Sequence, residues 1–399
     1  MKINQFISKF KLFWKIFISS SKVWKLPQKS DILIYDACGK EVLMPYLKNY
    51  SVSILSLRGE FLCLPCLILA CLKLAFWKGE LLNAYSEVFI KIVSPKIIIT
   101  LIDNNANFYT ISKKFCNIKT IFIQNGLRGW SGDIFGRLIK SQSYHVDFMI
   151  VFGDAIGRHY RKYISGKSIS IGSLKNNAFN GSVISGNYVL FISQWHKKPN
   201  NDKPFYFEAN GKVVKWENFF EAENKVLQFL DEWCHKNNLE LKICGRETND
   251  VNEKIFYKNL ISKCKLNYVS RSGIFSSYKL INNSKIVVTI DSTLGYESLA
   301  RGKRTAFFSC RKVGISKQQR TTFGWPLDLP DNGFFWTNNM DSRKFQSIMN
   351  FLNALKEKDW KKVSYKYTAE IMQFDRGNSK LISLLNILLP KYKAKTYVN

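Results

Sequence analysis

Short apolar runs alternate with longer amphipathic segments along this chain of 399 residues. Because each run is apolar at nearly every position, it predicts a strand that is buried on both faces of a sheet. The segments between the runs have helical spacing, and strict alternation of strands and helices predicts a parallel sheet covered by helices on both faces. The first round of this pattern places strands at 32–35, 52–57, 97–102, 120–123, 148–152 and 168–171.

The pattern restarts after a stretch rich in Gly, Ser and Asn at 173–187, which is typical of a linker. The second round predicts strands at 188–193, 239–244, 266–269, 286–290 and 305–308. The sequence therefore predicts an α/β protein of two Rossmann-like domains, 31–172 and 188–340, that face a central cleft. A helical tail, 341–399, is expected to pack back across both domains.

The chain carries 60 Lys and Arg against 30 Asp and Glu, a formal charge of +30. This balance favours an anionic partner such as nucleic acid, an acidic membrane or a phosphorylated substrate, although codon usage in an A+T-rich genome also enriches lysine. A hydrophobic content of 46% excludes a disordered chain. The 9 cysteines, at irregular spacing, indicate a reduced, cytoplasmic protein and not a disulfide scaffold.

Residues 1–30 hold seven lysines and no acidic residue, and aromatic residues recur there at helical spacing. Such a basic amphipathic helix predicts peripheral attachment to the inner face of the cytoplasmic membrane, and packing of the helix on the protein core is the alternative. The apolar stretch 61–77 contains Pro65 and is short for a membrane span, so it predicts a buried helix. Its Cys63 and Cys66 are expected to be packed side chains, since no second Cys or His pair stands at zinc spacing.

Polar residues gather where a strand of the second half ends, and ligands of parallel sheets bind beyond the carboxyl ends of the strands. Asp291, Ser292 and Thr293 stand where strand passes to helix. The free amides and the dipole of that first helical turn predict a phosphate site, with an ordinary capped helix as the alternative. Gly295 allows the close approach of a ligand or of neighbouring backbone, and Glu297 is placed to reach a ribose hydroxyl.

The segment DSTLGYESLARGKRTAFFS at 291–309 resembles a family of bacterial surface-carbohydrate and O-antigen biosynthesis proteins. The segments IIITLIDNNANFYTISKKF, IFIQNGLRG and IGSLKNN share this resemblance, which covers roughly residues 30–385. It implies a glycosyltransferase with two Rossmann-like domains (GT-B), distantly similar to enzymes that use CMP-activated ulosonic acids. It also implies that a nucleotide donor is held mainly by the C-terminal domain.

Carboxylate and amide residues follow the strands of the first domain. Asp103 ends one strand and is expected to face the cleft, where it would take the proton of the acceptor hydroxyl, or else to cap the next helix. Amide and guanidinium groups suit sugar hydroxyls, and the residues predicted to bind the acceptor glycan are Asn104, Asn105, Gln124, Asn125 and Arg128.

Cationic and small residues end the strands of the second domain and are predicted to bind the donor. His196 would stabilise the departing nucleotide, because its departure builds negative charge on phosphate. Arg246 is expected to contact phosphate or a donor carboxylate, or else to form a surface ion pair. The other predicted donor-binding residues at these strand ends are Ser193, Gln194, Lys197, Gly245, Ser272 and Gly273.

No cofactor or metal ion is expected, since the chain has no P-loop, no Gly-x-Gly-x-x-Gly after the first strand and no Asp-x-Asp at a strand end. The first hypothesis is a metal-independent glycosyltransferase that acts on a surface polysaccharide or lipopolysaccharide, with a CMP-ulosonate donor favoured by the resemblance. The alternative is a polyol-phosphate transferase that uses CDP-glycerol or a similar donor. Nucleic acid is not an expected partner, because no nucleic-acid-binding motif is present.

Overall fold

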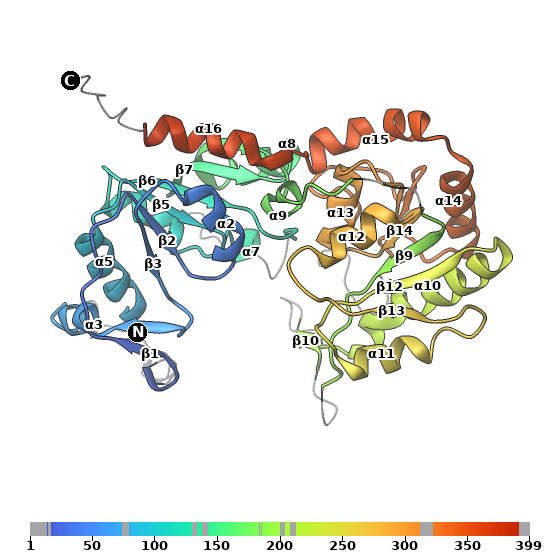
Figure 1. Ribbon diagram of the computed structural model, residues 1–399, viewed down its shortest axis with the longest axis horizontal. Helices are drawn as coiled ribbons and strands as arrows, with labels where there is room; N and C mark the ends of the chain where they lie inside the picture. Colours follow the sequence, from blue (N-terminus) through green and yellow to red (C-terminus); the bar gives the residue numbers. More distant parts are fainter. Residues whose placement is uncertain are drawn as a thin grey trace, which may run out of the picture.

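Two six-stranded parallel sheets form the two lobes of the protein (Figure 1). The computed structural model describes residues 14, 17–73, 80–129, 134–137, 143–182, 184, 186–199, 204–207, 213–311 and 322–390. Helices cover the sheets, and further helices follow the second sheet towards the C-terminus. The prediction of an α/β fold with two Rossmann-like sheets and a helical C-terminal region is therefore confirmed.

The first sheet has the strand order β3-β2-β5-β6-β7-β8. Its strands are β2 (Ile32–Tyr35), β3 (Val52–Leu55), β5 (Ile97–Thr100), β6 (Lys119–Ile123), β7 (Tyr144–Val151) and β8 (Ile164–Ser170). Among its helical segments are α2 (Lys40–Leu47), α5 (Leu81–Val93), η1 (Phe108–Thr110), α6 (Ile111–Lys114), α7 (Ile134–Arg137) and α8 (Asp154–Tyr160).

Alternate residues of the interior strand β2 enter two different cores. Leu33 and Tyr35 join the larger apolar cluster, whereas Ile32 and Ile34 join a second cluster on the other face of the sheet. A strand with a core on each face needs an apolar residue at every position, which explains the unbroken apolar run in the sequence.

The second sheet has the order β13-β12-β9-β14-β15-β16. Its strands are β9 (Tyr188–Ile192), β12 (Glu240–Cys244), β13 (Asn267–Val269), β14 (Ile286–Thr289), β15 (Thr305–Phe308) and β16 (Trp336–Thr337). The helices of this domain include α10 (Trp216–Lys236), α11 (Val251–Lys258), α12 (Ser276–Asn283), α13 (Thr293–Ala300) and α14 (Ser342–Ala354), and a short hairpin of β10 (Tyr206–Phe207) and β11 (Val213–Val214) precedes α10. The strand order reverses between β9 and β14, which is the position where open α/β sheets bind ligands.

The C-terminal helices α15 (Glu357–Ile371) and α16 (Ser379–Leu388), joined by η2 (Arg376–Asn378), extend across both lobes (Figure 1). Leu381 and Leu385 of α16 join the second apolar cluster of the first domain. The backbone N–H of Gln373 donates to the carbonyl of Phe152 at 2.8 Å. A Cβ atom at Gly153 would lie 2.3 Å from the carbonyl oxygen of Glu370, so only glycine lets the crossing chain pass.

The chain passes between the domains twice, and the two passages are bound to each other. The first contains α9 (Leu174–Ala178), within the predicted linker. Asn177 donates through Nδ2 to Oδ1 of Asn378 at 2.9 Å and accepts through Oδ1 from the backbone of Asp375 at 3.1 Å. Asn177 and Asn378 are fully buried, so these amide hydrogen bonds fix one passage against the other.

The apolar stretch predicted as one buried helix has a different structure. Its first residues form β4 (Phe61–Cys63), which pairs in parallel with β1 (Ser21–Val23), and α3 (Leu64–Cys71) follows directly. Residues 21–23 are therefore strand and not part of an N-terminal helix; residues 1–13 and 15–16 of that predicted helix lie outside the described residues. The Sγ atoms of the two buried thiols in CxxC lie 3.3 Å apart.

Helix α3 buries only part of its surface. Cys66, Leu67 and Ala70 face the core, whereas Ile68 and Leu69 are exposed. A helix that is apolar on all sides presents more apolar surface than one neighbouring layer covers, and the expectation of a fully buried helix is wrong for this reason. Within the described part of the chain, no helix is both long and apolar enough to cross a membrane.

Candidate active site

A pocket of about 500 Å³ lies at the switch point of the second sheet. Its walls come from the carboxyl ends of β9 and β12, from α12, and from the amino end of α13. Asn125, which follows β6, and Lys175 on α9 also line it, so the pocket lies between the domains. The lining residues are Asn125, Lys175, Ile192, Ser193, Cys244, Gly245, Arg246, Arg271, Ser277, Tyr278, Ser292, Thr293, Leu294 and Glu297.

Cationic side chains dominate the charge of this pocket. Lys175, Arg246 and Arg271 line it, and among its described lining residues Glu297 is the one acidic side chain. Burial raises the pKa of Glu297, against the opposing effect of hydrogen bonds from Ser173 and Tyr278. Burial, followed by the nearby charge of Arg271, lowers the pKa of Lys175. The pocket therefore suits an anionic ligand.

The amino end of α13 forms part of the wall of the same pocket. Ser292 caps the helix, with its Oγ accepting from the N–H of Leu294 at 3.3 Å, and Thr293 and Leu294 line the pocket. The N–H groups of Leu294 and Gly295 already donate to Ser292, so it is the positive end of the helix dipole that favours phosphate and carboxylate groups here. Thr293 also connects the domains, because its Oγ1 accepts from the N–H of Leu127 at 3.2 Å.

Arg246 is oriented by His196. Its Nη1 donates to the carbonyl of Trp195 at 2.9 Å and contacts Nε2 of His196. Burial, followed by the charges of Arg246 and Arg311, lowers the pKa of His196 to about 4. The imidazole is therefore neutral at pH 7 and accepts a hydrogen bond from the guanidinium, so the structure gives His196 a positioning role instead of the predicted contact with phosphate. Lys197 is exposed and does not line the pocket.

A buried polar cluster supports the strand ends beneath the pocket. Ser193 donates through Oγ to Oε1 of Glu253 at 2.5 Å and accepts from the hydroxyl of Tyr257 at 2.7 Å. Gly245 lines the pocket, and a Cβ atom there would lie 2.5 Å from the hydroxyl oxygen of Tyr268, so packing against Tyr268 requires glycine at this position. These contacts fix the position of the residues that line the site.

Asp291 belongs to an ion-pair cluster outside the pocket lining. Its Oδ2 lies 3.0 Å from Nε of Arg311, and Nη1 of Arg311 lies 2.7 Å from Oε2 of Glu223. Gln194 joins this cluster, because its Oε1 accepts from the backbone of Asp291 at 3.2 Å. Gln194 and Asp291, which were predicted to bind the nucleotide donor, thus belong to a network with the buried side chains of Glu223 and Arg311.

Gly295, Ser272 and Gly273 also differ from their predicted role. A Cβ atom at Gly295 would lie 2.3 Å from Cγ2 of Thr289, so this glycine serves the packing of α13 on β14. The Oγ of Ser276 accepts from the N–H of Ser272 and donates to the carbonyl of Gly273, both at 3.2 Å. These contacts close the turn before α12, and neither Ser272 nor Gly273 lines the pocket.

Asp103 is fully buried at the end of β5 and is saturated with donors. Arg128 donates from Nε to Oδ2 at 2.7 Å, Tyr160 donates its hydroxyl to Oδ2 at 2.6 Å, and the N–H of Asn125 donates to Oδ1 at 3.2 Å. A general base must reach the acceptor hydroxyl. These contacts give no support to a role as base, and they differ from a cap of the next helix, because Asp103 binds the end of the neighbouring strand.

Of the five predicted acceptor residues, all of them described, Asn125 lines the pocket. Gln124 is buried, where its Oε1 accepts from the N–H of Phe152 and its Nε2 donates to the carbonyl of Gly126, both at 3.0 Å. Asn105 closes a local turn, and neither it nor Asn104 reaches the pocket lining. Arg128 is held by Asp103. The predicted sugar-binding role of these four residues is therefore not supported by their positions.

Several lining residues were not predicted. Lys175 belongs to the segment IGSLKNN, whose composition indicates only a linker, and Arg271 directly precedes the predicted pair at 272–273. Ser277 and Tyr278 lie within α12 and come to the pocket because of the way that helix packs. The hydroxyl of Tyr278 donates to Oε2 of Glu297 at 2.9 Å, and Ser173 donates to Oε1 at 2.5 Å. Glu297 thus lines the pocket with both oxygens already bonded.

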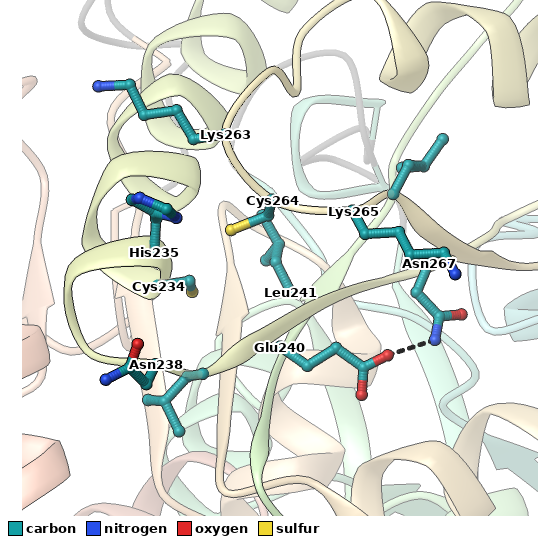
Figure 2. Close-up of a pocket in the computed structure, with 11 residues that line it drawn as sticks. Cys234, His235, Asn238, Glu240, Leu241, Lys263, Cys264, Lys265 and Asn267 are labelled. Atoms are coloured by element: carbon teal, nitrogen blue, oxygen red, sulfur yellow. Dashed lines mark hydrogen bonds between the residues drawn. The ribbon is translucent and has the colours of Figure 1, made fainter.

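A second pocket, of about 670 Å³, lies at the opposite, amino end of β12 and β13 (Figure 2). Cys234 and His235 from the end of α10 face Lys263 and Cys264 across it. Because ligands of open α/β sheets bind at the carboxyl ends of the strands, this pocket is not the candidate active site. No group of three His, Cys, Asp or Glu residues in the described ranges is placed to hold a metal ion.

Solved structures with the same two-domain fold include UDP-N-acetylglucosamine 2-epimerases. One such enzyme is 12% identical with a TM-score of 0.53 and matches 90% of this chain and 96% of its own. The enzyme from Methanocaldococcus jannaschii, with a TM-score of 0.51, and that from Neisseria meningitidis bound to UDP-GlcNAc, with 0.50, are each 10% identical and match 89% of this chain and 99% of their own. At this identity the likeness shows the fold, which is of the GT-B type that the sequence resemblance implies.

No curated protein matches the sequence. A family model described as "putative O-antigen biosynthesis protein" matches residues 121–389, well over half of the chain. This match includes all strands of the second sheet and every lining residue of the pocket between the domains. It confirms the resemblance that the segment at 291–309 indicates. The chain belongs to this family of O-antigen biosynthesis proteins.

Proposed function

We propose that the protein is a glycosyltransferase that moves a sugar from a nucleotide donor to a surface polysaccharide or lipopolysaccharide. The observation that carries this proposal is the pocket between the domains, where Lys175, Arg246, Arg271 and the amino end of α13 meet at the switch point of the second sheet. Membership in an O-antigen biosynthesis family supports a sugar as the transferred group.

The cationic pocket suits the chemistry of a departing nucleotide. Cleavage of the bond between the sugar and the phosphate oxygen leaves negative charge on phosphate, and fixed positive groups lower the barrier by stabilising that charge. The amino end of α13, where Ser292 and Thr293 line the pocket, would bind the phosphate, and Arg246 is already held in place by Trp195 and His196. The proposed reaction uses no metal ion or other cofactor, since the protein's own cations supply the positive charge.

A CMP-activated ulosonic acid is the donor that we favour. Such a donor carries a phosphate and a carboxylate on the same anomeric carbon, so two anionic groups lie close together. Lys175, Arg246 and Arg271 come from three different elements of the pocket wall, which supports a ligand with more than one anionic group. The acceptor, a glycan or a lipid-linked glycan, would approach from the first domain, where Asn125 forms the rim.

A thermal-shift panel with CMP-, UDP-, GDP- and CDP-linked ligands, in the presence of EDTA, tests the proposal. A ligand that binds the native state raises the midpoint temperature of unfolding. At a ligand concentration of about a hundred times Kd, it adds about 2.7 kcal/mol to the free energy of unfolding. We expect the CMP-linked sugar to give the largest shift. No shift with any nucleotide would contradict the proposal.

Product analysis separates the related reactions. Incubation with a donor and a lipopolysaccharide acceptor should give a glycosidic bond and a free nucleotide monophosphate. A phosphodiester in the product would instead identify a polyol-phosphate transferase that uses CDP-glycerol or a similar donor. An epimerised nucleotide sugar would match the activity named for the similar solved structures.

A further inference from the structure

Large apolar side chains are exposed together at one corner of the first domain. β1 pairs with β4, β4 continues into α3, and Sγ of Cys63 lies 3.4 Å from the carbonyl oxygen of Lys25, so the segment around β1 lies beside β4 and α3 (Figure 1). The side chains of Trp24, Ile68 and Leu72 are 76%, 62% and 80% exposed. We call this surface the apolar corner; its members are Ile18, Trp24, Leu26, Ile68, Leu69 and Leu72.

The apolar corner is not an ordinary scatter of surface residues. Helix α3 presents Ile68 and Leu69 to solvent on the side opposite Cys66, Leu67 and Ala70, so its outer face is apolar where a surface helix usually carries polar groups. Contiguous exposed apolar patches on soluble proteins mark sites of interaction with a membrane or another protein. The exposed apolar side chains therefore make this surface a candidate site of interaction.

The charge around the apolar corner identifies the partner. The chain from residue 1 to residue 30 contains seven lysines and no acid, and Lys25 and Lys29 are exposed beside the corner. Two copies that met through this surface would bring these lysines together, which disfavours a dimer. A bilayer with anionic headgroups matches both properties, because it accepts apolar side chains at its interface and attracts lysines to its surface. Trp24 suits such an interface, where tryptophan is enriched.

We propose that the apolar corner inserts into the interface of an anionic lipid bilayer, with Lys25 and Lys29 at the headgroups. The first domain would then lie against the membrane. This inference rests on the exposed surface alone and stands whether or not the pocket binds a nucleotide sugar. A lipid-linked acceptor, where the proposed transfer uses one, would be present at the same membrane.

Vesicle flotation of the full chain tests the proposal. Vesicles of phosphatidylcholine alone are compared with vesicles that also contain phosphatidylglycerol. We expect binding to the anionic vesicles that weakens as salt rises. The double variant Trp24→Ser/Leu72→Ser should lower the partition coefficient at least about tenfold, because two buried apolar side chains are lost from the interface.

Matched controls lie on the C-terminal helices. Tyr365→Ser and Ile387→Ser remove side chains that are each 75% exposed, away from the apolar corner, and should leave vesicle binding unchanged. Lys25→Gln/Lys29→Gln should reduce binding to anionic vesicles and leave the weak binding to neutral vesicles as it is. The proposal is overturned if the wild type does not prefer anionic vesicles, or if Trp24→Ser/Leu72→Ser binds as well as the wild type. The proposal is also overturned if light scattering shows that the wild type is a dimer and that the double variant is a monomer, because the partner of the apolar corner would then be a second copy of the chain.

Discussion

Replacing Asp103 by Asn tests whether this residue holds the fold or performs catalysis. Its carboxylate has no exposed surface and pairs with Arg128, whose side chain is 9% exposed. The amide removes the negative charge and turns an NH₂ group towards Arg128 or towards the hydroxyl of Tyr160. Breaking a buried ion pair from one side costs about 3–5 kcal/mol, so we expect the free energy of unfolding to fall by about that amount.

Urea unfolding of the wild type and three variants measures this loss. Tyr160→Phe removes one hydrogen bond to the same carboxylate and should cost about 1.5–3 kcal/mol. Glu370→Gln breaks the exposed pair with Arg158 and should cost about 0–1 kcal/mol. If Asp103→Asn were as stable as the wild type, the reasoning would be refuted. If that stable variant had also lost sugar transfer, Asp103 would be the catalytic base after all.

Two further predictions concern packing and pH. Gly295→Ala should lower stability by about 1–3 kcal/mol through its clash with Cγ2 of Thr289, and Thr289→Ser, which removes that methyl group, should recover part of the loss in thermal unfolding. The pKa of His196 is lowered to about 4, so between pH 6.5 and 4 the unfolded chain binds more protons than the native protein, and stability falls as pH falls through that window. His196→Gln should reduce the difference in midpoint between pH 7 and pH 5, and part of the difference should remain because the pKa of His159 is also lowered to about 4. An unchanged pH dependence in His196→Gln would contradict the neutral, half-buried imidazole.

The fold follows from local sequence signals to a large extent. Strands with a core on both faces, such as β2 and β14, are apolar at almost every position and are therefore visible in the sequence. The pairing of β1 with β4 is not visible, because each strand has three residues and the partners lie about 40 residues apart. Short strands of this kind depend on tertiary contacts and not on their own pattern.

The candidate site follows from the strand-end rule only in part. The rule locates Ser193, Arg246 and Thr293, because the residues after parallel strands meet at one edge of the sheet. It does not distinguish a free carboxylate from a paired one, and Asp103 becomes an ion-pair residue only because Arg128 folds back onto it. Lys175 reaches the pocket through the path of the interdomain chain, which no local pattern encodes.

The most direct test of the proposed function is calorimetric titration of a CMP-activated ulosonic acid into the wild type and Arg271→Met, with Lys279→Met as the control. Arg271 lines the pocket, whereas Lys279 is an exposed cation on the adjacent α12 and does not line it. Loss of a hydrogen bond to a charged group costs about 1.5–3 kcal/mol, so Arg271→Met should bind roughly 10- to 150-fold more weakly, while Lys279→Met should bind as the wild type does. Unphosphorylated cytidine should give no measurable heat. Equal affinity of the wild type and Arg271→Met, or no binding of the nucleotide sugar by any of the three proteins, would contradict the assignment of this pocket as the donor site.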